Sequence, residues 1–278
     1  CLYSGQFPDI IRYSGLLKAK FPKIPIVLGG IHPTIYPKEI LSDCPSIDWV
    51  IIGEGEDSFI RFINKYKKGE KDFSDLDGFA YRAGNEVRVN PKTKFIEDLD
   101  ALPMPAYDLV RFSDYYVDTS GWYNPRKLSF KTTIPIITSR SCPNRCSFCS
   151  MYRVMGPKWR TRSPENVLKE IEYLYHEHGI RHFSFMDDNM TLERSHILSI
   201  CGQIKKKNLE IEFETPNGIS IRTLDEEVLD AMVSSGLVRL SLAIESGSDY
   251  IRNKVMGKRL GDEKIHEIVK LVKKYKDL

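Results

Sequence analysis

The sequence contains no run of about 18 apolar residues, so it has no segment of the length and composition that crosses a membrane. Its first residues also lack the basic region followed by an apolar one that marks a secretory signal peptide. Six cysteines among 278 residues are too few for a secreted scaffold held by disulfides. The net charge is only +3, from 41 Lys and Arg against 38 Asp and Glu, which does not indicate nucleic-acid binding. These absences predict a soluble, cytoplasmic protein with no membrane span and no nucleic-acid partner.

The composition that remains is that of a globular protein. With 41% hydrophobic and 28% charged residues, the chain is neither disordered nor of low complexity. Its 278 residues are enough to bury the core of one large or two ordinary domains. It begins at Cys1 rather than at a methionine, and it stops at Leu278 within an amphipathic run. We therefore expect a fragment of a longer protein.

Residues 1–70 alternate between helix and strand patterns. The apolar runs 24–28 and 49–52 are typical of buried strands, and apolar residues at helical spacing surround them. Buried strands separated by helices predict a parallel sheet covered on both faces. Ligands of such sheets lie at the carboxyl ends of the strands, where Gly29-Gly30 and Gly53-Glu54-Gly55 fall. Two tight strand-to-helix turns would account equally for these glycines, so both interpretations stay open.

Residues 71–130 do not continue the alternation of helix and strand patterns and are predicted to be a linker. Alternating residues on either side of Gly84-Asn85 predict a small hairpin. The segment 98–106 carries two prolines and cannot be helical throughout.

Residues 131–278 return to alternation with longer helices. Apolar strands are predicted at 134–138, 182–186, 211–214 and 237–244. Ser163 followed by Pro164 predicts the start of a helix that ends at Gly179, and 223–226 is interpreted as a capping box that opens another. Four strand–helix units in series predict part of a βα barrel, with its chemistry at the carboxyl ends of the strands.

The strongest motif is a C-x-x-x-C-x-x-C formed by Cys142, Cys146 and Cys149, in the loop after the first of these strands. A structural zinc site usually has four ligands, and no second cysteine pair follows. Three thiolates on a [4Fe–4S] cluster leave one iron open to another ligand, and thiolates are the usual cluster ligands. The motif therefore favours a cluster, with a degenerate zinc knuckle or three unlinked thiols as the alternatives.

This motif and its position resemble those of radical S-adenosylmethionine (SAM) enzymes. The resemblance implies that the three cysteines ligate the cluster, that Phe148 lies beside the adenine of SAM, and that reductive cleavage of SAM yields a 5′-deoxyadenosyl radical. It also implies an external electron donor of the flavodoxin or ferredoxin type. Ser141 stands where relatives often have glycine, which leaves the ligands intact.

The ends of the later strands supply the other SAM contacts that the resemblance implies. Asp187 and Asp188 follow the second strand, where relatives contact the SAM amino group, and a carboxylate suits an ammonium partner. An acidic turn that caps a helix is the alternative for either aspartate. Arg222 follows the third strand and could meet a carboxylate, while a surface arginine is the alternative. Glu245 follows the fourth strand and resembles the residue that bonds the SAM ribose.

The amino-terminal half resembles the subfamily that carries a cobalamin-binding domain ahead of the cysteine motif. The motifs that carry this likeness are 28–34, 52–56 and 98–106. The residues that it places around cobalamin and its nucleotide tail are Gly29, Gly30, His32, Gly53, Glu54 and Gly55. The cobalt-ligating histidine of relatives belongs to a motif nearer the start of that domain, so His32 is interpreted as a structural or tail-contact residue.

Together these observations predict an α/β protein with three parts. Residues 1–70 are the carboxyl-terminal part of a Rossmann-like (flavodoxin-like) cobalamin-binding domain, 71–130 a linker, and 131–278 a partial TIM-type radical SAM barrel. The predicted activity is methylation of an unactivated carbon of a small-molecule substrate, with a [4Fe–4S] cluster, SAM and cobalamin as cofactors. Cyclisation or rearrangement without methyl transfer is the first alternative, and a zinc-binding regulatory module the second.

Overall fold

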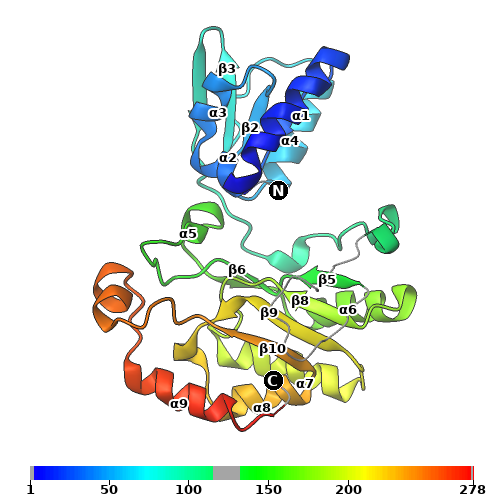
Figure 1. Cartoon of the computed structure of the whole chain (residues 1–278). Helices are drawn as coiled ribbons and strands as arrows, with labels where there is room; N and C mark the ends of the chain where they lie inside the picture. The colour runs from blue at the N-terminus through cyan, green and yellow to red at the C-terminus, as the bar shows by residue number, and fades with distance from the viewer. Residues whose placement is uncertain (1–2, 115–131, 277) are drawn as a thin grey trace. The chain divides into compact units, whose positions relative to one another are not determined.

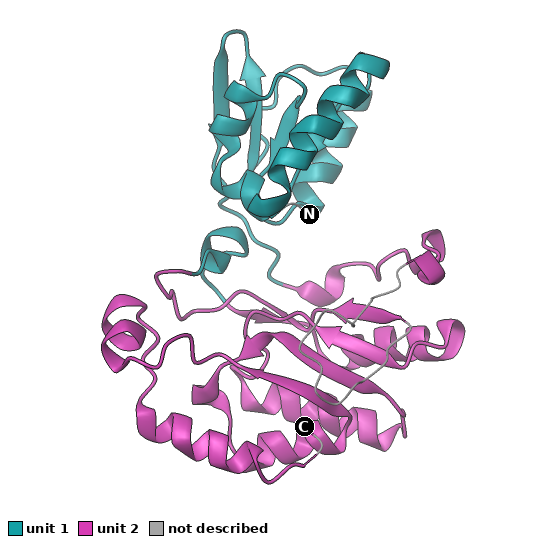
Figure 2. Cartoon of the chain, viewed as in Figure 1, with its two compact units in different colours: residues 1–97, 149–158 teal, residues 98–148, 159–278 magenta. Residues whose placement is uncertain are grey.

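The computed structural model describes residues 3–114, 132–276 and 278, and the chain divides into two compact units (Figure 2). Unit 1 comprises residues 1–97 and 149–158, and unit 2 comprises residues 98–148 and 159–278. Each unit is built around its own sheet.

Unit 1 contains a four-stranded sheet in the order β1-β2-β3-β4 (Figure 1). β1 and β2 are parallel, whereas β3 pairs antiparallel with both β2 and β4. The strands are β1 (Val27–Leu28), β2 (Trp49–Ile51), β3 (Phe79–Ala83) and β4 (Glu86–Asn90). The helices are η1 (Ser4–Gln6), α1 (Phe7–Lys20), α2 (Ile31–Ile35), α3 (Pro37–Asp43), α4 (Glu56–Lys67) and the short α5 (Met151–Val154).

Both faces of this sheet carry a core, as the sequence predicts. Val50 and Ala80 point into one apolar cluster, which includes Ile40 and Leu41 of α3. The alternate residue Ile51 points into the other cluster. That second cluster is mostly aromatic and also contains Phe62, Phe73, Leu76, Phe79 and Tyr81. Successive side chains of a strand face opposite sides of the sheet, so helices on both sides bury the apolar side chains of both faces.

The predicted hairpin is present, but it belongs to unit 1. β3 and β4 flank Gly84-Asn85, and β3 pairs residue by residue with β2. Because that pairing extends the sheet, the compact unit continues to Glu97 rather than ending near residue 70. Residues 98–114 of the predicted linker lie in unit 2, and 115–130 lie outside the described residues.

Unit 2 contains a four-stranded parallel sheet whose strands are neighbours in chain order: β5, β8, β9 and β10 (Figure 1). The strands are β5 (Thr133–Ile136), β8 (His182–Phe185), β9 (Glu212–Ile219) and β10 (Leu237–Leu242), with a small antiparallel pair of β6 (Ser139–Arg140) and β7 (Arg160–Thr161). The α-helices are α6 (Pro164–His178), α7 (Arg194–Lys206), α8 (Glu226–Ser234) and α9 (Asp262–Val272). Short turns are η2 (Leu99–Ala101), η3 (Tyr107–Leu109), η4 (Phe112–Asp114), η5 (Ile221–Thr223) and the π-helix η6 (Tyr250–Val255).

The two faces of the unit 2 sheet differ in character. Phe183, Phe213 and their in-register neighbour Ile134 belong to one large apolar core, which the helices complete. The opposite face is polar. There the Thr133 Oγ1 lies 2.9 Å from Nδ1 of His182, and Ser184 donates to Glu214, which also pairs with Arg239. A sheet covered by helices on both faces is apolar on both, so the polar face of this sheet differs from that arrangement.

The start of α6 agrees with the prediction from the sequence, whereas the start of α8 does not. Ser163 caps α6 by accepting from Asn166 N at 3.1 Å, and Gly179 ends it with φ 67°. The predicted capping box at 223–226 is wrong. Asp225 caps α8 by accepting from Val228 N at 2.9 Å, because the Thr223 hydroxyl is already bonded to Ser220 O and Thr191.

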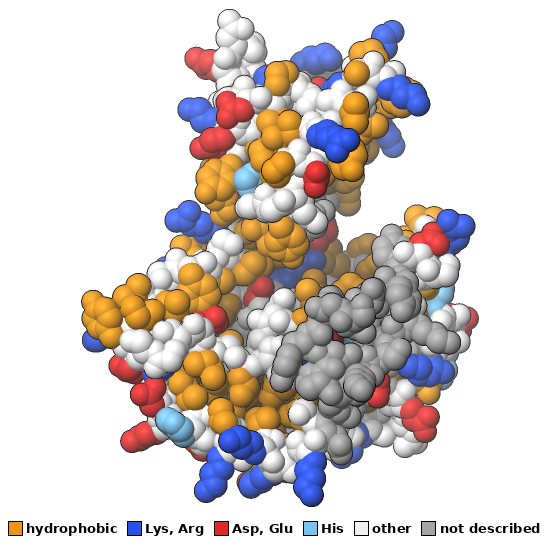
Figure 3. Space-filling view, in the orientation of Figure 1, with side chains coloured by type: hydrophobic (Ala, Val, Ile, Leu, Met, Phe, Trp, Pro, Cys, Tyr) orange, Lys and Arg blue, Asp and Glu red, His pale blue; other side chains and the backbone are white. Residues whose placement is uncertain are grey.

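In the part of the chain that the structure describes, no helix has both the length and the apolarity needed to cross a bilayer. On the face drawn in Figure 3, each unit carries both basic and acidic side chains, so neither presents a surface of a single sign there.

We predict that acid destabilises unit 2 through two buried histidines. Burial, with a smaller contribution from Arg239, lowers the pKa of His182 to about 4, and burial lowers the pKa of His196 on α7 to about 4. Between the unfolded value of 6.5 and about 4, the unfolded state binds more protons than the folded state, so the free energy of unfolding falls as pH falls. Each histidine contributes up to about 3 kcal/mol to this loss.

Urea unfolding between pH 7 and pH 4 measures the effect. His182→Gln and His196→Gln should each flatten the pH dependence, and His266→Gln, at an exposed position, should leave it as in the wild type. Equal slopes in all four proteins would contradict the prediction.

Candidate functional site

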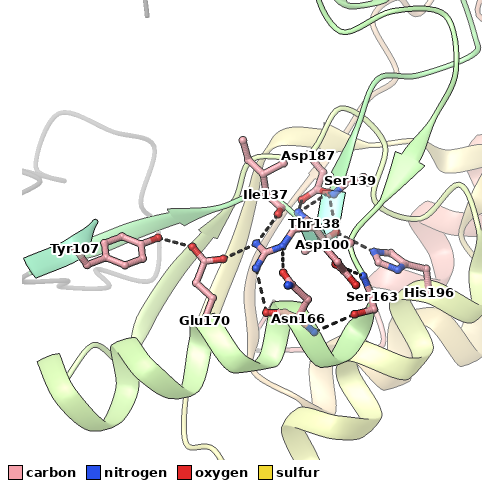
Figure 4. A network of polar contacts seen from close by, with 11 residues as sticks. Asp100, Tyr107, Ile137, Thr138, Ser139, Ser163, Asn166, Glu170, Asp187 and His196 are labelled. Carbon is pink, nitrogen blue, oxygen red and sulfur yellow. Dashed lines mark hydrogen bonds and ion pairs between the residues drawn. The ribbon is translucent and has the colours of Figure 1, made fainter. Parts of the chain in front are cut away.

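A buried carboxylate organises the carboxyl end of the unit 2 sheet. Asp187, which follows β8, accepts hydrogen bonds from the backbone N–H and the hydroxyl of both Thr138 and Ser139 (Figure 4). Its Oδ1 lies 2.7 Å from Thr138 Oγ1 and 2.6 Å from Ser139 Oγ. Burial raises the pKa of Asp187, and the four hydrogen bonds oppose that rise. The carboxylate thus ties β8 to the segment that leads into the cysteine motif.

Further polar contacts hold this segment from the sides of α6 and α7 (Figure 4). Arg162 donates to the carbonyl of Ile137 at 3.0 Å and pairs with the buried Glu170. Tyr107 also donates to Glu170, and its pKa is raised by burial and by that carboxylate. His196 Nε2 lies 3.0 Å from Thr138 Oγ1. These contacts fix the strand end on which the cysteine motif begins.

Asp188 performs a different task from its neighbour. Its carboxylate accepts from the backbone N–H of Ser141 at 2.9 Å. Ser141 is buried and has φ 73°, in the left-handed region that favours glycine. Burial and the Asp187 charge outweigh the Ser141 hydrogen bond and raise the pKa of Asp188 to about 6.

The third residue of this segment, Asn189, reaches the first cysteine. Its Nδ2 donates to Cys142 Sγ at 3.5 Å, and its backbone carbonyl accepts from Trp159 Nε1 at 3.1 Å. Asn189 is 3% exposed, yet its Oδ1 has no hydrogen-bond partner among the described residues. A buried amide oxygen normally has one. An additional donor beside Cys142, such as the ammonium group of a bound amino acid, therefore fits this position.

The three cysteines supply the sulfur donors that suit an iron–sulfur cluster. Cys142 is half-buried and Cys146 is buried in unit 2, while the half-buried Cys149 begins the 149–158 segment assigned to unit 1. Within the described residues, no group of three or more His, Cys, Asp and Glu side chains is arranged to hold a metal ion.

A second cluster gathers Phe148 and Glu245. Ser147 donates from its backbone N to Met256 O at 3.0 Å and from its hydroxyl to Val255 O at 2.9 Å, which ties the cysteine motif to the segment after β10. Lys258 of that segment lies 2.6 Å from Glu245 Oε1 and 5.8 Å from the centre of the Phe148 ring. Sequence reasoning missed Lys258 because no motif or spacing marks it.

Arg222 is not brought to this region by any described contact. It is exposed on η5, and the described residues include no polar partner for its side chain. Its predicted role in SAM binding stays a prediction.

In unit 1, one hydroxyl joins the two glycine loops. Thr34 Oγ1 donates to Gly30 O at 2.7 Å and accepts from Gly53 N at 2.8 Å. Gly53 has φ 69°, and a Cβ there would lie 2.9 Å from Lys92 Cγ and 3.1 Å from Val154 O, so the protein's own packing requires this glycine. The sequence signal for Thr34 is its place in the Gly-Gly-Ile-His-Pro-Thr run, in which the two glycines and the histidine are the predicted cobalamin residues.

Two of the other residues predicted around cobalamin, His32 and Glu54, have polar partners within unit 1. His32 Nδ1 lies 2.9 Å from Ser4 Oγ, its ring packs 4.3 Å from that of Phe7 and 5.1 Å from that of Tyr36, and burial lowers its pKa. The buried Glu54 accepts from Ile96 N at 2.9 Å. Gly29 has room around it, with Ile51 as its nearest neighbour, and Gly55 precedes α4. Cobalamin contacts for all of these residues stay predictions.

We predict that Asp187 is a structural requirement and that Asp188 is much less so. Asp187→Ala would leave four buried donors without their acceptor and should lower the free energy of unfolding by about 3 kcal/mol or more. Asp188→Ala removes one acceptor and should cost about 1 kcal/mol. Urea unfolding of the ligand-free protein compares the two, and equal losses would refute this division of tasks.

Comparison with known proteins agrees with this arrangement. The family model of the radical SAM superfamily matches residues 136–277, and that of the B12 binding domain matches residues 1–63. An uncharacterized methyltransferase of Pyrococcus horikoshii is 32% identical over 250 residues, which are 90% of this chain and 51% of that protein. An anaerobic magnesium-protoporphyrin IX monomethyl ester cyclase of Synechocystis is 26% identical over 246 residues, 88% of this chain and 47% of that protein. The chain spans about half the length of the curated relatives it matches.

Among solved structures, the cobalamin-dependent S-adenosylmethionine radical enzyme OxsB has a TM-score of 0.77 and 21% identity, over 98% of this chain and 38% of that one. This likeness shows a shared fold. The matches confirm the predicted family and fold class and the three predicted cofactors, an iron–sulfur cluster, SAM and cobalamin. The chain belongs to the radical SAM superfamily and carries a B12 binding domain at its amino-terminal end.

Proposed function

We propose that this chain is part of a cobalamin-dependent radical SAM enzyme that methylates an unactivated carbon of a small-molecule substrate. The observation that carries the proposal is the contact of Cys142 with Asn189, because it brings the first cysteine of the motif to the carboxyl end of the neighbouring strand. In parallel α/β sheets, ligands and chemistry lie at that end.

Each predicted residue has a task in this proposal. Cys142, Cys146 and Cys149 hold the cluster, and the residues that hold SAM are Phe148, Asp187, Asp188, Arg222 and Glu245. Asp187 acts by positioning the strand end, since its oxygens already accept four hydrogen bonds. The glycine loops of unit 1, together with His32 and Glu54, line the cobalamin site. When bound, the cluster and SAM supply hydrogen-atom abstraction and cobalamin supplies the methyl group.

The architecture within the proposal is a cobalamin-binding domain that includes the β3–β4 hairpin, followed by a partial TIM-type barrel. Two features of unit 2 support the barrel. Its strands are neighbours in strict chain order, as in a βα barrel. One face of the sheet is polar, with Ser184, Glu214 and Arg239 in contact, as suits an interior that faces ligands rather than a second helix layer.

The setting follows from the chemistry. A cluster that cleaves SAM needs electrons one at a time, so the proposal includes an external donor of the flavodoxin or ferredoxin type. A cytoplasmic location suits three cysteines that must stay reduced to bind iron.

The cluster is tested by anaerobic reconstitution of the purified full chain with iron and sulfide. We expect a brown protein with about four iron and four sulfide per chain, and loss of most of both in Cys142→Ala, Cys146→Ala and Cys149→Ala. Cys44→Ala, at a buried thiol of unit 1, is the matched control and should retain the cluster. A colourless protein that copurifies with zinc would contradict the proposed cluster.

Methyl transfer is tested with SAM that carries a deuterated methyl group. With cobalamin, a reductant and a small-molecule extract of the source cells, we expect a product that gains the labelled methyl group. A product that changes without gaining the label would favour the cyclisation or rearrangement alternative, which the likeness to the magnesium-protoporphyrin cyclase keeps open.

A further inference from the structure

We propose that the side chain of Asn189 donates a hydrogen bond to a cluster-ligating sulfur, that of Cys142, and thereby raises the reduction potential of the cluster. This inference rests on the proposed function, because it needs a cluster at the cysteine motif. It assigns Asn189 the role of a positioning and tuning residue.

The backbone around Asn189 is held firmly. Asp187, two residues before it, accepts four hydrogen bonds from Thr138 and Ser139. The carbonyl of Asn189 accepts from Trp159 Nε1 at 3.1 Å and from Leu192 N at 3.3 Å. The side chain is 3% exposed, so solvent cannot replace its contact with Cys142. The amide therefore stays beside the sulfur.

The orientation of the amide follows from its partners. Nδ2 lies 3.5 Å from Cys142 Sγ, and Oδ1 has no partner among the described residues. A thiolate is an acceptor, so the NH₂ group suits it and the carbonyl oxygen does not. The opposite orientation would set two acceptors against each other and would remove the only partner that the described residues give to Nδ2.

The effect on potential follows from charge. Reduction adds an electron to the cluster and its thiolates, and a donor aimed at a thiolate stabilises the more negative state more strongly. Hydrogen bonds to the sulfurs and the shell around a metal site are established means of tuning such potentials. Loss of the Asn189 donor should therefore lower the potential and make the cluster harder to reduce.

The test is an anaerobic redox titration of the reconstituted full chain, followed by electron paramagnetic resonance of the reduced cluster. Asn189→Leu removes the donor at similar size, and Asn189→Asp keeps the shape but only accepts hydrogen bonds. At the potential where the wild type is half reduced, we expect the ratio of reduced to oxidised cluster to fall about tenfold in both variants. That ratio corresponds to about 59 mV for one electron.

Asn217→Leu is the matched control. Asn217 Nδ2 donates to Met186 O at 2.9 Å, just after β8, the strand that Asn189 also follows, and no hydrogen bond among the described residues joins it to a cysteine. It should leave the potential unchanged. Iron and sulfide content shows that each protein holds an intact cluster, and Asn189→Ala, whose side chain has no hydrogen-bond donor, replaces either variant that does not.

The outcomes separate the two proposals. A wild-type chain that takes up no [4Fe–4S] cluster overturns the proposed function, and the inference with it. A loaded wild type with unchanged potentials in the Asn189 variants overturns the inference alone. An equal fall in Asn217→Leu would assign the effect to a general disturbance of the strand end, which also overturns it.

Discussion

The buried carboxylate of Asp187 is the interaction on which the candidate site depends. Burying a carboxylate is costly unless several donors satisfy its oxygens, and the N–H and O–H groups of Thr138 and Ser139 do so. These two residues connect β5 to the cysteine motif, so the ends of β5 and β8 become one junction. Cys142 lies only three residues beyond Ser139, so the junction of β5 and β8 fixes its position.

Three consecutive side chains after β8 then act on three different groups. Asp187 holds the strand end, Asp188 accepts from Ser141, and Asn189 donates to Cys142. The left-handed backbone of a non-glycine residue costs about 1–2 kcal/mol, and the hydrogen bond from Ser141 offsets part of that cost. The segment thus stabilises both the conformation and the chemical surroundings of the first cysteine.

In both units, a single polar side chain joins loops that follow different strands. Thr34 joins the loops of Gly30 and Gly53 in unit 1, and Lys258 joins Glu245 to Phe148 in unit 2. Loops at the strand ends carry the chemistry of α/β proteins, while the sheets supply fixed positions for them. The polar face of the unit 2 sheet is likewise held by polar side chains. There Glu214 contacts Ser184 and Arg239, and the face does not form a second apolar layer.

The sequence alone determined the features whose causes are local. The cap at Ser163 and the turn at Gly84-Asn85 each depend on residues a few positions apart, so both could be predicted. The spacing of the three cysteines is likewise local, and it indicated an iron–sulfur site. The cap of α8 could not, because Thr223 is engaged by Thr191 on another segment. Only the tertiary structure decided that β3 extends the sheet of β2 and that Asn189 meets Cys142, 47 residues away in the chain. Such contacts have no local pattern, because they depend on which strand ends lie side by side once the core has formed.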